Sequence, residues 1–164
     1  MADPEPLPSV SAFRQAAERR DLEGILATLT PDVVIHSPVS TRLRFEGIEQ
    51  ARELFGIVFA ELGEFTYTDD FGDEESRILV YRGRFVGEEI EETQVLRLAA
   101  DGRIRELTFF IRPLPGLAGI AGGLAPRLAR RRHGVLLVLV MSLAGRVLKL
   151  LVSLGDRIGA RLLR

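Results

Sequence analysis

The chain has 164 residues, which is enough for one domain of about 100–150 residues and an appendage. Its net charge of −1 conceals two parts of opposite sign: residues 1–112 carry 13 arginines and 22 acidic residues, or −9, whereas residues 113–164 carry eight arginines, one lysine and one aspartate, or +8. The acidic part would repel nucleic acid, which we exclude as a partner, and the lack of cysteine excludes disulfides, thiolate metal sites and cysteine nucleophiles.

The first 31 residues predict a disordered lead and two helices. Residues 1–8 are acidic and rich in proline, without the apolar stretch of a secretory signal, so we expect a cytoplasmic protein. In residues 9–20, "SVSAFRQAAERR", apolar residues recur at helical spacing and a serine can cap the start. Residues 21–29, "DLEGILATL", predict a second, short helix that Asp21 caps and Pro31 ends.

A strand and the most regular helix of the body follow. The β-branched run of residues 32–37, "DVVIHS", predicts a strand that stops at Pro38, and a short strand is expected at Arg42–Phe45. From Gly47 to Leu62, apolar residues repeat every three or four positions, which predicts a helix with one buried face.

The remainder of the body predicts four strands in close succession. Each run is rich in β-branched and aromatic residues, and the separators "GDEE", "GEE" and "DG" are turn-like. The strands are predicted at residues 64–71, 76–86, 89–100 and 103–112. Three helices before an antiparallel meander predict an α+β fold, in which the helices pack against one face of a curved antiparallel sheet.

Glu92 and Gln94 are notable because they lie on the apolar face of the third of these strands. Alternation places them with Ile90, Leu96 and Leu98, which face inward. A buried polar group without a partner costs about 1–3 kcal/mol. The two side chains therefore either line a ligand pocket or lie where the end of the strand leaves the core and both are hydrated.

Two other side chains are candidates for a general base. Alternation places Asp69 on one face with Phe65, Tyr67 and Phe71, where a carboxyl would have a raised pKa; the alternative is a solvated position at a hairpin tip. A general base is a natural role for a histidine such as His36, but alternation places it opposite the inward face, where it would be a surface histidine. The second histidine lies in the C-terminal tail, so no metal site is predicted.

These elements together resemble the nuclear transport factor 2-like superfamily, which includes ketosteroid isomerases and SnoaL-like polyketide cyclases. The most specific part is the order of helix, turn, helix, strand and proline in "RRDLEGILATLTPDVVIHSPVS", which the helix after Gly47 and the last strands support. The resemblance covers residues 9–115 and identifies them as a SnoaL-like domain. It implies a cone-shaped α+β fold with a deep, mostly apolar pocket, and a homodimer.

The resemblance does not carry over the ketosteroid isomerase mechanism. In those enzymes an aspartate base stands directly before the proline that follows the first strand, and here Ser37 has that position. A tyrosine of the first helix donates to the developing oxyanion, and here the matching residue is Phe13. The second donor, a protonated aspartate, corresponds approximately to Gln94. The base and one donor are therefore replaced.

What remains is a pocket that we expect to bind a small, largely apolar molecule without a cofactor. The alternative is an isomerase, cyclase or hydrolase of the same superfamily, with Asp69, Glu92 or His36 as the base. The residues predicted to contact the ligand are Phe13, Ser37, Leu54, Val58, Tyr67, Gln94, Leu107, Phe109 and Ile111.

The basic C-terminal part is expected to comprise a linker or helix over residues 116–133 and a helix over 134–164. In this last helix, polar and basic residues recur every three or four positions, and leucine, valine and isoleucine occupy the other faces. Such a helix suits a membrane interface, on the cytoplasmic face of a membrane, although it would equally pack on a second copy or on the acidic body. Arg146 and Lys149 near its centre disfavour a membrane span.

Overall fold

The computed structural model describes residues 8–129 and, beyond them, residues 143, 147, 150–152, 154, 155 and 158, which are helical. The predicted disordered lead, apart from Pro8, and most of the predicted helix 134–164 lie outside the described residues. No helix within the described residues is long and apolar enough to cross a membrane. The elements are α1 (Pro8–Glu18), α2 (Leu22–Ala27), β1 (Leu29–His36), β2 (Arg44–Glu46), α3 (Gly47–Glu61), β3 (Leu62–Gly72), β4 (Ser76–Phe85), β5 (Glu88–Leu98), β6 (Ile104–Arg112) and α4 (Leu114–Ala129).

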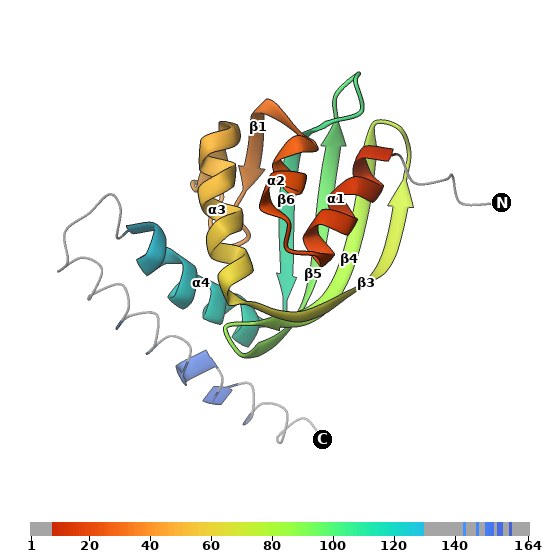
Figure 1. Cartoon of the computed structure of the whole chain (residues 1–164). Coiled ribbons are helices and arrows are strands. Elements are labelled where there is room, and N and C mark those ends of the chain that lie inside the picture. The colour runs from red at the N-terminus through yellow and green to blue at the C-terminus, as the bar shows by residue number, and fades with distance from the viewer. Residues whose placement is uncertain are drawn as a thin grey trace.

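One curved sheet of six strands organises the body, in the order β2-β1-β6-β5-β4-β3. All neighbours are antiparallel except β1 and β6, which are parallel. The helices α1, α2 and α3 lie over one face of this open sheet, and α4 lies across one of its ends (Figure 1). The predicted α+β class, with N-terminal helices on a curved sheet, is confirmed.

The second helix is shorter and the first strand longer than predicted. The side chain of Asp21 accepts a hydrogen bond from the N–H of Gly24, which caps the start of α2 as expected. The helix ends at Ala27, because Leu29 already pairs with Ile104 of β6. Pro31 therefore lies inside β1, next to an irregularity in its pairing with β6, instead of ending the helix.

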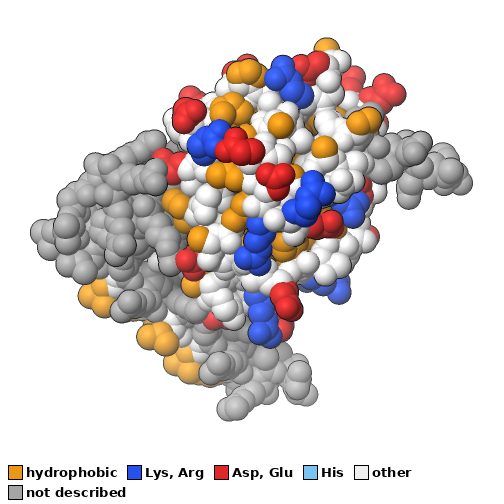
Figure 2. Space-filling model, in the orientation of Figure 1, with side chains coloured by type: hydrophobic (Ala, Val, Ile, Leu, Met, Phe, Trp, Pro, Cys, Tyr) orange, Lys and Arg blue, Asp and Glu red, His pale blue; other side chains and the backbone are white. Residues whose placement is uncertain are grey.

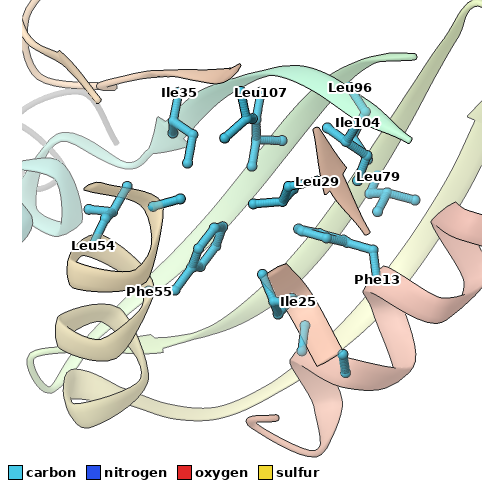
Figure 3. Close-up of a cluster of buried hydrophobic side chains, with 14 of the residues drawn as sticks. Phe13, Ile25, Leu29, Ile35, Leu54, Phe55, Leu79, Leu96, Ile104 and Leu107 are labelled. Carbon is cyan, nitrogen blue, oxygen red and sulfur yellow. The ribbon is translucent and has the colours of Figure 1, made fainter. Parts of the chain in front are cut away.

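The core fills the space between the three helices and the concave face of the sheet. Phe13 of α1 and Phe55 of α3 meet edge to face, with ring centroids 6.3 Å apart, and both are buried. Figure 3 shows them converging with Ile25, Leu29 and Leu54 on side chains of the sheet. Side chains from three helices and from the sheet thus form one apolar cluster, which continues into the cavity described below.

A bulge in β3 changes which of its residues face inward. Tyr67 pairs with Tyr81, whereas Asp69 pairs with Val80, so that two steps along β3 correspond to one step along β4. The extra residue reverses the alternation beyond Tyr67, and Asp69 is exposed. The prediction that Asp69 shares a face with Tyr67 is therefore wrong: Asp70 takes the inward position.

Candidate functional site

A small, mostly apolar cavity lies between the helices and the concave face of the sheet. Its volume is about 60 Å³, which is small beside the roughly 300–1,000 Å³ of pockets that hold drug-sized ligands. Ile120 of α4 is part of its wall. A ligand of more than a few atoms would therefore have to displace side chains such as Ile120.

Four side chains of the wall come from one row across the sheet. Tyr67 of β3 pairs with Tyr81 of β4, which pairs with Glu92 of β5, which pairs with Ile111 of β6. All four side chains line the cavity. The curvature of the sheet turns this row toward the helices, so a carboxyl and two phenols share one apolar chamber.

Hydrogen bonds connect the polar groups of the wall. The Tyr67 hydroxyl donates to Gln94 Oε1 at 3.4 Å, and Gln94 Nε2 donates to Glu92 Oε1 at 2.8 Å. Tyr81 also hydrogen bonds to the Glu92 carboxyl. Since Glu92 and Gln94 are 7% and 6% exposed, the predicted inward face of this strand is correct, and the alternative of a hydrated strand end is wrong.

The environment of Glu92 shifts its proton equilibrium toward neutral pH. Burial raises the pKa of the Glu92 carboxyl to about 7, although the hydrogen bonds from Gln94 and Tyr81 favour the ionised form. Burial, together with the negative charge of Glu92, raises the pKa of the Tyr67 and Tyr81 phenols above the ordinary range. A carboxyl that is about half ionised at neutral pH is able to accept a proton and return it.

The raised pKa of Glu92 predicts that the protein loses stability as the pH rises from about 4.5 to about 7. In this window the unfolded chain releases a proton that the folded protein retains, so the free energy of unfolding falls by up to about 3 kcal/mol. Glu92→Gln should remove this loss. Urea denaturation of both proteins at about pH 5 and about pH 8 measures it, and equal pH dependence in the two would contradict the burial of an ionisable Glu92.

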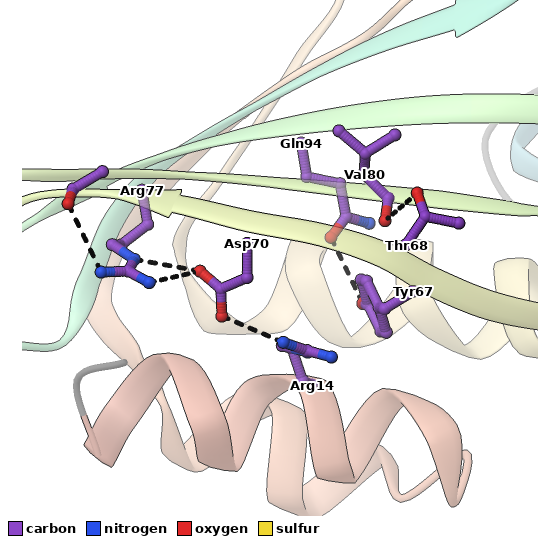
Figure 4. Close-up of polar contacts among 8 residues, drawn as sticks. Arg14, Tyr67, Thr68, Asp70, Arg77, Val80 and Gln94 are labelled. Carbon is purple, nitrogen blue, oxygen red and sulfur yellow. Dashed lines mark hydrogen bonds and ion pairs between the residues drawn. The ribbon is translucent and has the colours of Figure 1, made fainter. Parts of the chain in front are cut away.

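An ion-pair network supports the wall from the side of α1. The guanidinium carbon of Arg14 lies 5.0 Å from the centre of the Tyr67 ring. Arg14 Nη1 also donates to Asp70 Oδ2 at 3.1 Å, and Arg77 binds Asp70 Oδ1 through Nε at 3.0 Å and Nη2 at 2.6 Å (Figure 4). The network holds α1 against β3 and fixes Arg14 beside a tyrosine of the cavity.

The structure brings most of the predicted site residues to the cavity. Leu107 is an exception: it is fully buried in the core but is not part of the cavity wall. His36 is also elsewhere, with Nε2 3.1 Å from Glu106 Oε1 and a side chain that is 38% exposed. The predicted residues that line the cavity are Phe13, Ser37, Leu54, Val58, Tyr67, Glu92, Gln94, Phe109 and Ile111.

Sequence reasoning missed Tyr81, which completes an aromatic cluster with Phe65 and Tyr67. The rings of Phe65, Tyr67 and Tyr81 contact one another edge to face, with centroids 5.2–5.7 Å apart. Alternation along β4 identifies Tyr81 as inward, but only the pairing of β4 with β5 places it beside Glu92. Within the described residues, no group of three or more histidine, aspartate or glutamate side chains is arranged to hold a metal ion.

Comparison with known proteins gives a family profile and several similar structures. The profile of the SnoaL-like domain matches residues 10–107. No curated protein sequence matches the chain. A steroid delta-isomerase from Pseudomonas aeruginosa is similar in structure, with 26% identity and a TM-score of 0.68 over 75% of this chain and 90% of that one.

Two structures with lower sequence identity share the fold. An uncharacterised protein with a cystatin-like fold from Silicibacter pomeroyi has 18% identity and a TM-score of 0.69, over 74% of this chain and 85% of that one. A putative polyketide cyclase from Sinorhizobium meliloti has 20% identity and a TM-score of 0.53, over 63% and 94%. These similarities confirm the predicted cone fold.

Proposed function

We propose, from the premise that this chain belongs to the SnoaL-like domain family, that its cone cavity binds a small, largely apolar carbonyl compound and that Glu92 moves a proton on it. The observation that carries the proposal is a buried carboxyl with a pKa of about 7 on the wall of an apolar cavity. The reaction would be an isomerisation or a cyclisation. Both begin when a base removes a proton from a carbon next to a carbonyl group.

The wall also supplies a group that suits the oxygen of such a compound. The hydroxyl oxygen of Ser37 accepts a hydrogen bond from the N–H of Val39 at 3.2 Å, which leaves its own proton to donate. Ser37 lines the same cavity as Glu92. A carbonyl oxygen near Ser37 would gain a hydrogen bond as negative charge develops on it, while the Glu92 carboxylate takes the carbon-bound proton.

The similarity to the steroid delta-isomerase supports this class of reaction but not its details. That protein is named as a steroid delta-isomerase, and its sequence is 26% identical to this chain. Here Phe13 and Ser37 stand where the resemblance places a tyrosine and an aspartate, so the base must come from another position. Glu92 is the one carboxylate that lines the cavity among the described residues.

A small β,γ-unsaturated ketone should bind saturably and change the tyrosine emission of the protein. This emission reports on the cavity, because the chain has no tryptophan and its two tyrosines both line the cavity wall. Val58→Arg should abolish the change, since Val58 of α3 lines the cavity and a long side chain would fill it. The matched control is Ile57→Arg, next to it on α3 but outside the cavity wall. Equal titrations for the two variants would contradict binding in this cavity.

A further inference from the structure

The described residues of the C-terminal segment present one apolar stripe to solvent. Its large hydrophobic side chains are between 47% and 70% exposed. At 100° per residue, these helical positions fall within about 100° of arc. Figure 2 shows hydrophobic side chains at the outer edge of this segment, turned away from the body. The stripe consists of Leu143, Val147, Leu150, Leu151, Leu154 and Ile158.

The sequence adds positive charge beside this stripe. Arg146, Lys149 and Arg157 recur with the same helical period but out of phase with the apolar positions. Three further arginines precede the segment at residues 130–132, and Asp156 is the one acidic residue after Arg112. An apolar stripe beside basic residues is the pattern of helices that lie flat in the interface of an anionic membrane.

We propose that this stripe docks on an anionic membrane surface, with its leucines among the acyl chains and the basic residues at the headgroups. The acidic body is not the occupant, because the stripe is exposed with the body in place. A second copy is disfavoured, since residues 113–164 carry a net charge of +8 and pairing two of them would bring like charges together. Anionic lipid neutralises the same charges, and this electrostatic attraction adds to the binding free energy gained when the stripe is buried.

Sedimentation of the full chain with phospholipid vesicles tests the docking. The chain should bind vesicles that contain phosphatidylglycerol, bind phosphatidylcholine vesicles much more weakly, and lose affinity as salt screens the headgroups. The double variant Leu150→Glu, Leu154→Glu should lower the apparent affinity for the anionic vesicles by about tenfold or more, because two side chains that enter the membrane become charged. Both positions are more than half exposed, so the fold should be retained.

The matched control is Phe71→Glu, which makes an exposed apolar residue of the body acidic at the end of β3. It should bind anionic vesicles like the unaltered chain. The proposal is overturned if the full chain does not bind anionic vesicles at low salt, or if the double variant and the Phe71→Glu control bind equally. A dimer in solution that the double variant converts to a monomer, without vesicle binding, would overturn it in favour of a second copy.

Discussion

Asp70→Ala should lower the free energy of unfolding by about 3–5 kcal/mol, the cost of removing one partner from a buried ion pair. The Arg77 side chain is 2% exposed, and the Asp70 carboxylate accepts from both its Nε and its Nη2. Arg77 also donates to the Gly72 carbonyl at 3.5 Å, but this neutral acceptor does not balance the positive charge of the guanidinium. Without the carboxylate, Arg77 and the neighbouring Arg14 would also repel each other. Urea denaturation followed by tyrosine emission measures the loss.

The residue before it offers a matched control. Asp69 is exposed and hydrogen bonds locally, accepting from the Thr68 hydroxyl at 2.7 Å. Asp69→Ala should therefore change the stability by less than about 0.5 kcal/mol. The contrast between neighbouring aspartates depends on the bulge in β3. If Asp69→Ala were the more damaging of the two, the alternation would continue unbroken through Tyr67 and the structure of this strand would be wrong.

The inward face of β5 was predictable because nothing interrupts its period of two. Its pairing with β4 is continuous from Glu88 to Arg97, and its pairing with β6 is continuous up to Arg97. Alternation from Ile90 and Leu96 therefore places Glu92 and Gln94 correctly. The bulge of β3 was not predictable from the sequence. The extra residue is inserted at Thr68, and no glycine or proline stands there to mark an irregular strand.

Alternation gives the face of a strand but not the depth along the cone. Leu107 lies on the same face of β6 as Phe109 and Ile111, and all three were predicted to contact the ligand. Leu107 pairs with Ile35 of β1 and with Leu96 of β5, both of which are fully buried in the core. Four residues further on, Ile111 pairs with Glu92 at the cavity. Only the register of several strands distinguishes these two levels.

Glu92→Gln should reduce the turnover of a β,γ-unsaturated ketone by about 10²–10⁴-fold while its binding is retained, if Glu92 is the general base. Glutamine keeps the volume of the side chain and a hydrogen-bond acceptor for Tyr81, but it cannot take up a proton. The assay is the ultraviolet absorbance of the conjugated product, with the tyrosine-emission titration as the measure of binding. In the unaltered protein, kcat/KM should rise as the pH passes through about 7, where Glu92 ionises.

The three candidate bases give this experiment its controls. His36 pairs with Glu106 outside the cavity, and Asp69 is exposed, so His36→Gln and Asp69→Asn should leave both turnover and its pH profile unchanged. If the rise of kcat/KM near pH 7 is lost in Glu92→Gln and kept in the two controls, the proton transfer is assigned to the Glu92 carboxyl. If Glu92→Gln turns over the ketone at the original rate, Glu92 is not the base. Binding in the cavity would then stand alone, because the titration of the Val58→Arg and Ile57→Arg pair does not depend on Glu92.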